Sequence, residues 1–536
     1  MFTSRFLTVC LTLAFCLALG YAEVARLWPT PQHHSFGTKN VLLDNDFQFE
    51  TSTQLSLLED AFKRYREYIL TSSLHAPEGT SAMSLVSVVS VQIDSRNLDL
   101  NMGTDESYEI SITEMSISIS ARTVYGALRA LETFSQLVEE SSDGHLYIRQ
   151  CPITIKDFPR YQWRGLLIDT SRHFLPVGTI KRMVDSLSFN KMNVLHWHIV
   201  DAQSFPYKSL SYPSFAERGA FRPDLVYDSA TIKSIVDYAQ QRGVRVVMEL
   251  DVPGHAYWGD AAPHIRAQCP GGYSKNVNNY PLDPSKGETF DVISDLIGEL
   301  SDLTIDDYFH LGGDEPVFSC WTKNTEIKQW MDSRGFKSGN DVYSYFFNKT
   351  LPFVYKKSKK PIVWHEAALL DSNLPKDTLV QVWSGESNVE KVINMNFDII
   401  YSVGYYLDKS KPAGKVRYAF MQTMADFFER EPTRGLSELQ ASRIKGLSAA
   451  MWSEGVDANS IEERVWPRAS GTADRAWIKL PDNVDMAYEN RRAERQRCRM
   501  NGRGIRASPL VPWERGLRQV KGDLGNFCRF SVAPFN

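Results

Sequence analysis

The sequence lacks any surplus of positive charge and, beyond its first residues, any long apolar run. It carries 60 Lys and Arg against 64 Asp and Glu, a net charge of -4 at pH 7. Binders of nucleic acid or of anionic membranes usually carry a basic patch, so this balance argues against both partners. After residue 22, no segment is long and apolar enough for a transmembrane helix. The last four residues, 533–536, are not a retention signal.

The first residues have the pattern of a secretory signal peptide. Arg5 precedes an apolar run of 14 residues that ends at Leu19, too short to span a bilayer as a helix. Small residues at 20–22 suit cleavage. We therefore predict a signal peptide at 1–22 and a secretory route, extracellular or lysosomal, with an uncleaved anchor as the alternative. This route permits N-glycosylation, and Asn348 begins the one sequon that we find.

Cysteine usage agrees with secretion. Removal of the signal leaves five of the seven cysteines, an odd number that leaves one unpaired. Cys269 and Cys320 flank residues 310–315, and Cys498 and Cys528 flank the C-terminal tail. We predict these two pairs as disulfides and expect Cys151 to be free.

The N-terminal third differs in pattern from the remainder. At 536 residues, the chain is too long for one ordinary core. Residues 81–91 and 108–113 are β-rich, the second with clean alternation, and 123–137 has apolar residues at helical spacing. We predict a small, non-catalytic α+β domain at 23–158.

From residue 159 onward, short apolar runs alternate with helical patterns such as 180–189 and 230–242. Eight strands alternating with helices predict a (β/α)8 TIM barrel, here at 159–536 with a helical tail. The predicted strands are 164–169, 193–201, 244–251, 307–311, 361–364, 379–383, 398–401 and 446–452. Catalytic residues of such barrels lie just past the C-terminal strand ends. Those positions hold Asp201, His255, Asp314, Glu315, Trp364, Trp383 and Glu454.

The run HLGGDE at 310–315 places two carboxylates beyond a strand and a glycine turn. Adjacent side chains on a regular strand point to opposite faces. Gly312 and Gly313 remove that constraint, so Asp314 and Glu315 can serve one pocket. Glycoside hydrolysis usually needs two carboxylates beside the scissile bond. The alternative is a loop with two solvated acids.

The histidines offer a competing chemistry. His196 and His198 lie on one strand face and, with His255 and His310, are candidates for the metal site of a barrel hydrolase. His196 falls in mid-strand, however, where barrel interiors are packed. Buried, hydrogen-bonded histidines are therefore the favoured interpretation.

Residues 491–506 carry seven arginines. Polyanion binding is one interpretation of this segment. The favoured one is a helix that packs on the barrel, because Glu489 and Glu494 interleave with the positive charge.

Several motifs together resemble one known family. They are LWPTPQ at 27–32, TVYGALRALETFSQL at 123–137, RGLLIDTSRH at 164–173, LHWHIVD at 195–201, HLGGDE at 310–315, MWSE at 451–454 and VWPR at 465–468. With these, the chain resembles the β-N-acetylhexosaminidases of glycoside hydrolase family 20, of the secreted or lysosomal eukaryotic type. The resemblance covers nearly the whole mature chain.

The resemblance implies a retaining exo-enzyme that works by substrate-assisted catalysis, an exception to the two-carboxylate rule. The 2-acetamido oxygen of the sugar would attack the anomeric carbon and form an oxazolinium intermediate. The implied substrates are terminal β-linked GlcNAc or GalNAc of glycans or chitooligosaccharides. The resemblance implies no metal or other cofactor. It does imply a homodimer that forms through the barrel.

Residue roles are also carried over by resemblance. Glu315 would be the general acid/base, Asp314 would hold the acetamide N–H, and Tyr406 would donate to the acetamide oxygen. The pocket walls and ring-binding groups would be Trp364, Trp383, Trp452, Arg164 and Glu454, and the relay behind the acid would be Asp201 and His255.

Asp408 occupies a position where an acid is linked to neutral sugars in this family. The negative charge of Asp408 should repel a sulfate, and the neighbouring Lys409 only softens that repulsion. We therefore expect neutral substrates. Besides the metal-dependent hydrolase, a non-catalytic sugar-binding relative is the other alternative to this enzyme.

Overall fold

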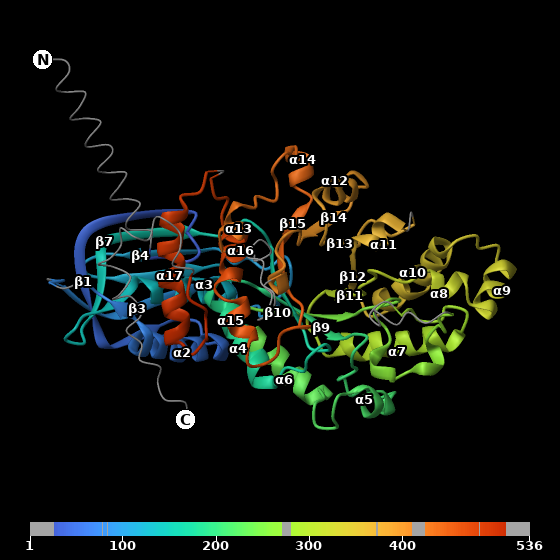
Figure 1. The fold of residues 1–536 in the computed structure, drawn as a ribbon. Helices are drawn as coiled ribbons and strands as arrows, with labels where there is room; N and C mark the ends of the chain where they lie inside the picture. The colour runs from blue at the N-terminus through green and yellow to red at the C-terminus, as the bar shows by residue number, and fades with distance from the viewer. Residues whose placement is uncertain are drawn as a thin grey trace, which may run out of the picture.

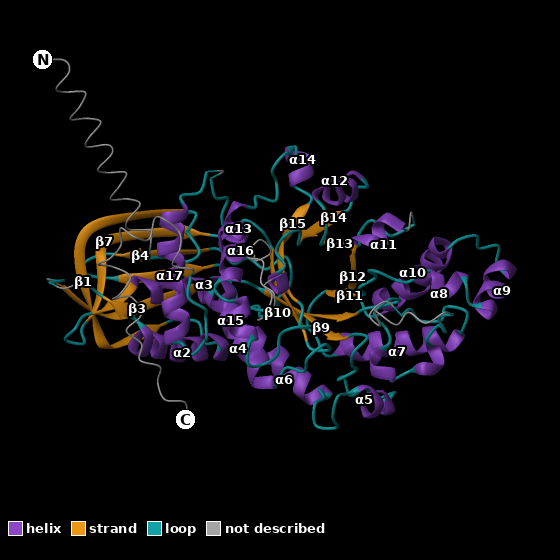
Figure 2. Cartoon of the chain, viewed as in Figure 1, coloured by secondary structure: helices purple, strands orange, loops and turns teal. Residues whose placement is uncertain are grey.

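A computed structural model gives the structure of this protein and describes residues 26–77, 79–82, 84–270, 280–370, 373–409, 424–481 and 483–510. The predicted signal peptide and Cys528 lie outside these residues. Figure 2 shows a strand-rich part joined to a helix-rich part. No helix among the described residues is long and apolar enough to cross a membrane.

The N-terminal part is a seven-stranded mixed sheet in the order β1-β3-β5-β4-β7-β6-β2. Its strands are β1 (His33–Glu50), β2 (Leu74–His75), β3 (Ser84–Ile93), β4 (Tyr108–Ile112), β5 (Ile117–Ala121), β6 (Val138–Glu140) and β7 (Leu146–Asp157). Alternate residues of β4 and β5 are buried, as expected for strands with one face on a core.

Two helices cover that face of the sheet: α2 (Ser56–Ser72) and α3 (Val124–Leu137). Thr123 caps the N-terminus of α3, and its hydroxyl accepts a hydrogen bond from the Gly126 N–H. Every residue of α3 is buried, because the helix lies between the sheet and the barrel (Figure 1). Arg129 of α3 donates to the carbonyl of Gly243 in the barrel.

Eight parallel strands close into a barrel, with β15 pairing back to β8. They are β8 (Trp163–Asp169), β9 (Val194–Val200), β10 (Arg245–Leu250), β11 (Tyr308–His310), β12 (Lys360–Trp364), β13 (Leu379–Val382), β14 (Asp398–Tyr401) and β15 (Ile444–Met451). All eight strand predictions are confirmed. The predicted fold class, a TIM barrel after a small α+β domain, is confirmed with them.

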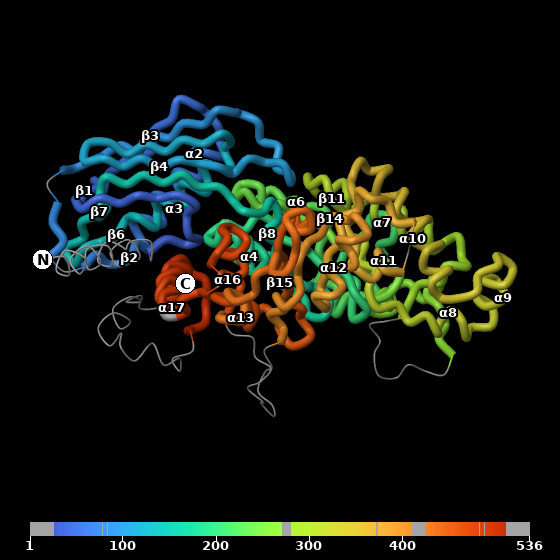
Figure 3. Tube along the Cα trace, turned by 90° about the horizontal axis from the view of Figure 1, so that it is seen from above, coloured from blue at the N-terminus to red at the C-terminus, as the bar shows by residue number. Residues whose placement is uncertain are grey.

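Full-length helices follow six of the strands: α4 (Val177–Phe189), α6 (Ser229–Gln240), α7 (Gly287–Asp302), α10 (Gly339–Lys356), α12 (Glu386–Asn394) and α16 (Arg468–Trp477). The helices after β12 and β14 are short: α11 (His365–Leu370), α13 (Met424–Glu429) and α14 (Glu438–Ala441). The barrel and the sheet lie side by side, as the view from above shows (Figure 3).

Buried charges fill the contact between the two parts. Glu106 accepts hydrogen bonds from Arg129 Nε at 2.8 Å and from Arg164 Nη2 at 2.5 Å. Beside them, Lys191 Nζ donates to Asp157 Oδ2 at 3.0 Å. We call residues 106, 129, 157, 164 and 191 the basal ion cluster, because it lies where β8 and β9 begin, opposite the catalytic end of a barrel.

The arginine-rich segment forms α17 (Met486–Gly502), which packs against both parts of the chain (Figure 1). Arg492 pairs with Asp474 of the barrel at 2.9 Å, and Arg503 pairs with Glu132 of α3 at 2.8 Å. The packing interpretation is therefore confirmed, with the sheet domain as an additional contact. Cys498 of this helix is disulfide-bonded, but its predicted partner lies outside the described residues.

Candidate active site

The turn after β11 brings the two adjacent carboxylates to one side. Gly312, Gly313 and Glu315 have positive φ angles of 65°, 105° and 46°. A Cβ on Gly312 would lie 1.8 Å from Asp251 Oδ1, so this position has room for glycine alone. As a result, Asp314 Oδ2 and Glu315 Oε2 lie 3.6 and 3.7 Å from His255 Nε2. The two acids therefore share one pocket.

Neighbouring elements hold this turn in place. The Gly313 N–H donates to Asp251 Oδ1 at 2.9 Å, and the Tyr343 hydroxyl of α10 donates to the Gly313 carbonyl. Farther along, the predicted disulfide between Cys269 and Cys320 is confirmed and ties the segment after β10 to the segment after the turn. The predicted free Cys151 is confirmed as well, and it is buried.

Asp251 and Asp314 form a pair of buried carboxyl groups. Burial raises the pKa of Asp314 to about 6. Burial and the neighbouring Asp314 raise the pKa of Asp251 well above its usual range. Among the described residues, Asp251 Oδ2 and Asp314 Oδ1 have no hydrogen-bond partner. Asp251 is thus the member that keeps its proton, while Asp314 ionises near pH 6.

A relay leads from Asp201 through His255 to the acids. His255 Nδ1 lies 3.1 Å from Asp201 Oδ1. Burial alone would lower the pKa of His255, but Asp201, Asp314 and Asp251 raise it well above its ordinary value. The protonated ring in turn lowers the pKa of Glu315, whose side chain is 44% exposed. The structure therefore brings together the predicted catalytic residues Asp201, His255, Asp314 and Glu315. We call these four residues and Asp251 the catalytic cluster.

The predicted aromatic walls also meet. Trp364 and Tyr406 pack on Leu167 and Ala450, with Trp383 and Trp452 against them. The ring centroids of Trp364 and Trp452 are 6.1 Å apart, and those of Trp383 and Tyr406 are 6.0 Å apart. Burial raises the pKa of Tyr406 well above its usual value, and the nearby Asp314 adds to this shift. We call the three tryptophans and Tyr406 the aromatic cluster.

The prediction that Arg164 binds the substrate is wrong. Its side chain is fully buried in the basal ion cluster, paired with Glu106 at the start of β8. The arginine at the catalytic end is Arg172, past the end of the same strand. Its Nη2 lies 2.8 Å from Asp201 Oδ2 and 3.9 Å from Glu454 Oε1. The barrel rule, applied to RGLLIDTSRH, would have favoured the second arginine.

Glu454 and Asp408 lie beside this arginine and the aromatic cluster. The side chain of Glu454 is 53% exposed. Burial, with a contribution from Glu454, raises the pKa of Asp408 to about 6. In the part of the chain that the structure describes, Asp408 Oδ1 has no hydrogen-bond partner. These carboxylates are thus available to a polar ligand.

Comparisons with known proteins identify the family of this chain. Residues 161–480 match the family described as "Glycosyl hydrolase family 20, catalytic domain", and residues 27–137 match "beta-acetyl hexosaminidase like". The chain belongs to glycosyl hydrolase family 20. This confirms the family and the enzyme class predicted from the sequence, a β-hexosaminidase.

Relatives and solved structures of the family cover most of the chain. It is 37% identical over 487 residues to beta-hexosaminidase subunit A1 of Dictyostelium discoideum, covering 90% of each chain. It is 36% identical over 505 residues to beta-hexosaminidase subunit beta of Homo sapiens, covering 90% of this chain and 88% of that one. The chitobiase of Flavobacterium johnsoniae matches with a TM-score of 0.79 and 29% identity, over 90% of this chain and 73% of that chain.

Sequence reasoning missed three acids of this family 20 site. Asp251 follows β10 directly, a strand-end signal that was available. Glu366 accepts the Trp383 indole N–H at 2.9 Å. Glu249 lies inside the barrel and accepts the Trp364 indole N–H at 2.9 Å. An inward-facing acid within an apolar strand run gives no such signal.

His196 and His310 are packed inside this family 20 barrel, whereas His255 belongs to the catalytic cluster. His196, Glu249 and His310 are close enough to share an ion. However, the rings of His196 and His310 stack with centroids 4.5 Å apart and planes 26° apart. Nitrogen lone pairs of stacked rings run side by side, whereas a tetrahedral metal needs them to converge. The stacking favours packed, structural roles for His196 and His310, but among the described residues neither ring nitrogen of His196 has a hydrogen-bond partner.

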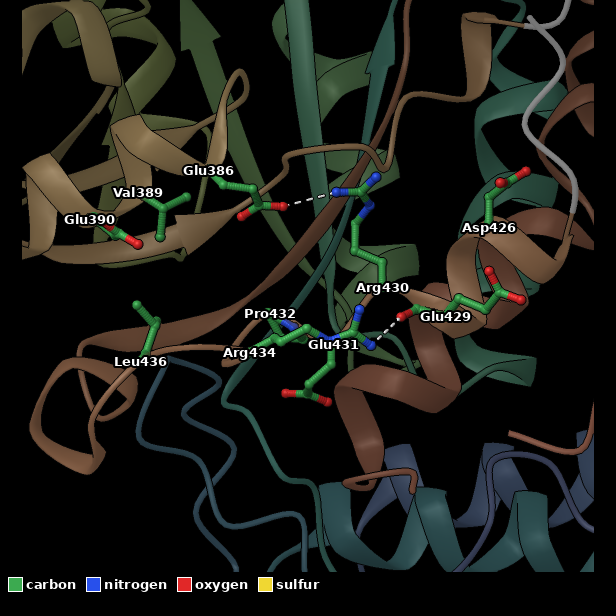
Figure 4. Close-up of a pocket in the computed structure, with 10 residues that line it drawn as sticks. All are labelled: Glu386, Val389, Glu390, Asp426, Glu429, Arg430, Glu431, Pro432, Arg434 and Leu436. Carbon is green, nitrogen blue, oxygen red and sulfur yellow. Dashed lines mark hydrogen bonds and ion pairs between the residues drawn. The ribbon is translucent and has the colours of Figure 1, made fainter. Parts of the chain in front are cut away.

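A cavity of about 400 Å³ lies elsewhere on the hexosaminidase (Figure 4). It is lined by Glu386, Val389, Glu390, Asp426, Glu429, Arg430, Glu431, Pro432, Arg434 and Leu436. Arg430 pairs with Glu386 across it at 2.9 Å, and Glu431 turns away to Arg160 and Arg475. No predicted site residue lines it, so we assign the chemistry to the catalytic cluster.

Proposed function

We propose that this chain is a retaining exo-β-N-acetylhexosaminidase that removes terminal, non-reducing β-linked GlcNAc or GalNAc. The observation that carries the proposal is the adjacent pair Asp314 and Glu315, which face one histidine and lie beside the aromatic cluster. With Glu315 as the proton donor and Asp314 beside the aromatic cluster, the pair suits an enzyme that supplies one acid and one positioning anion. The nucleophile is then the substrate's own acetamide.

In the first step, the acetamide oxygen bonds to the anomeric carbon as the glycosidic bond breaks. Glu315 gives its proton to the leaving oxygen. The ionised Asp314 accepts the acetamide N–H and stabilises the positive charge of the oxazolinium ring. In the second step, Glu315 takes a proton from water, whose oxygen bonds to the anomeric carbon and reopens the ring. Each displacement inverts the configuration of the anomeric carbon, so the two together retain it.

The aromatic cluster would hold the acetamide under the sugar ring. Tyr406 would donate its hydroxyl to the acetamide oxygen, and Trp364, Trp383 and Trp452 would enclose the methyl group. Such a pocket restricts the acetamide to a geometry near that of attack. Arg172, Asp408 and Glu454 would bind the ring hydroxyls, and Asp408 favours neutral sugars because it offers no positive charge to a sulfate.

The test is turnover of an aryl N-acetyl-β-glucosaminide beside the matching aryl β-glucoside. We expect hydrolysis of the first alone, since only it carries the acetamide. Equal cleavage of both would overturn the mechanism. Activity lost with a chelator and restored by zinc would instead support the metal-dependent alternative, and binding without turnover would support the sugar-binding one.

The cellular setting follows from the N-terminal sequence pattern, and the assembly follows from the family resemblance. We propose a secretory route to the lysosome or cell exterior, with cleavage after residue 22 and a sheet domain at 23–158 that takes no part in catalysis. Asn348 on α10 is exposed, which supports its glycosylation. The relatives above are named as subunits, which supports an oligomer, and the proposed form is a homodimer. Mass measurement in solution tests the dimer, and its change after glycosidase treatment tests the glycosylation.

A further inference from the structure

Glu249 is a buried anion at a junction between the two clusters. It lies on β10 with no exposed surface. Its Oε1 accepts the Trp364 indole N–H at 2.9 Å. Its Oε2 lies 2.8 Å from His198 Nδ1 and 2.8 Å from His196 Nε2. One carboxylate therefore holds a wall of the aromatic cluster and a histidine of the barrel interior.

His198 carries this contact to the relay. Its Nε2 lies 2.6 Å from Asp201 Oδ2, so carboxylates face both ring nitrogens. Ionised carboxylates only accept hydrogen bonds, and a neutral imidazole has one N–H. His198 is therefore an imidazolium, which agrees with a pKa that burial would lower but Glu249 and Asp201 raise well above its usual value.

The other charged groups around this junction come from three strands. Asp251 lies past β10 within reach of His198 and Asp201. Arg172, past β8, pairs with Asp201. His310 of β11 lies 3.4 Å from Glu249 Oε1, and burial lowers its pKa to about 3, so it stays neutral. The Glu249 and Asp201 anions are thus bridged by one cation, His198.

We propose that Glu249 is a positioning residue that aligns the acetamide pocket with the acid relay. The contacts run without a break from Trp364 through Glu249, His198 and Asp201 to His255, which faces Glu315. In the proposed mechanism, on which this inference rests, the acetamide attacks as the acid protonates the leaving oxygen. By fixing Trp364 and His198 at once, the Glu249 carboxylate would hold the acetamide pocket and the acid relay in the relative position that attack and protonation need.

Buried charge by itself does not separate a positioning role from a structural one, since the basal ion cluster is buried and charged as well; the place of the charge decides. Barrel interiors are commonly filled by branched apolar side chains. Burying ionisable groups instead carries a large desolvation cost, even when they are paired. The layer that contains Glu249 and His198 bears this cost directly beneath the site.

The experiment compares Glu249→Gln with a matched control, Asp306→Asn. Asp306 is an equally buried acid, paired with Arg245 at 2.8 Å near the start of β11, away from the site. Thermal unfolding of both variants shows whether each is folded. Because small misalignments cost up to roughly 100-fold in rate, we expect kcat/KM on chitobiose to fall at least about 10-fold in Glu249→Gln and to stay within about 2-fold in Asp306→Asn.

Two further variants separate the contact of Glu249 with the acid relay from its contact with Trp364. His198→Asn cuts the relay, so chitobiose turnover should fall more than that of a substrate with an activated leaving group, and the basic limb of the pH profile should move. Trp364→Phe removes the indole N–H, so KM should rise for both substrates at an unchanged pH profile. Glu249→Gln should show both signatures.

An unchanged leaving-group ratio and pH profile in a folded Glu249→Gln would overturn the inference. If that variant does not fold, a double-mutant cycle of His198→Asn and Trp364→Phe decides, since additive effects on kcat/KM would deny the coupling. These outcomes presuppose a native enzyme that hydrolyses chitobiose. Absence of turnover in the native enzyme would instead overturn the proposed function.

Discussion

The basal ion cluster and the catalytic cluster are both buried and charged, yet they differ in how the charges are matched. In the basal cluster, each oxygen of Glu106 accepts from an arginine. Burial alone would raise the pKa of Glu106, but Arg164 and Arg129 hold it below its usual value. In the catalytic cluster, Asp251 faces Asp314, and burial raises the pKa of both. Burial of ionisable groups is thus common to both ends, and a facing pair of acids, one of which keeps its proton, distinguishes the site.

The largest expected difference between the two clusters is in turnover. Glu315→Gln removes the proton donor, and we expect kcat/KM on chitobiose to fall roughly 10²–10⁴-fold. The loss should be smallest with an activated leaving group, which departs without a proton. Glu106→Gln, the same change in the basal cluster, should leave kcat/KM nearly unchanged. Steady-state kinetics on both substrates measures this, and a comparable loss in Glu106→Gln would contradict the distinction.

The two arginines flanking β8 should separate stability from catalysis. Arg164→Met leaves Glu106 buried with one partner fewer, so the free energy of unfolding should fall by about 3–5 kcal/mol with an unchanged KM. Arg172→Met, at the catalytic end, should raise KM and lower kcat. Denaturant unfolding and kinetics on both variants test this. A raised KM in a folded Arg164→Met would show that Arg164 does contribute to substrate binding.

Removal of a charge should have opposite effects on stability in the two clusters. The folded pKa of Asp314, about 6, lies above its ordinary value. Its contribution to stability is therefore present at low pH and lost as pH rises through about 6. At pH 7, Asp314→Asn should raise the free energy of unfolding by on the order of 1–3 kcal/mol, while Glu106→Gln should lower it. Thermal unfolding at pH 4 and pH 7 measures both, and a destabilised Asp314→Asn at pH 7 would contradict the argument.

The parts of the fold that depend on local pattern were predictable. Each barrel strand is a short apolar run. The glycines at 312 and 313 predict the turn that brings both acids to one pocket. The partners of buried charges were not predictable. Arg164 and Glu106 are 58 residues apart in sequence, and Glu249 and Trp364 are 115 apart. Nothing in either neighbourhood signals which pairs will meet.

The smallest expected effect is on pH dependence, about 10-fold per pH unit outside the optimum. Turnover of chitobiose needs Glu315 protonated and Asp314 ionised. The pKa of Glu315 is lowered by its interaction with His255, and that of Asp314 is raised by burial to about 6. The value of kcat/KM should therefore decrease at pH values below the pKa of Glu315 and again at pH values above about 6. The result is an acidic optimum whose two limits are set by Asp314 and Glu315 together.

A substrate with an activated leaving group sharpens this test, because it needs only the ionised Asp314. Its kcat/KM should rise with pH through about 6 and stay high, whereas that of chitobiose declines. In Asp314→Asn, the basic limb for chitobiose should move to lower pH, because Glu315 alone then sets it. Profiles of the two substrates from pH 3 to 9 decide the matter. A chitobiose profile that stays flat through neutrality would mean that the opposed shifts of the two acids do not persist when substrate binds.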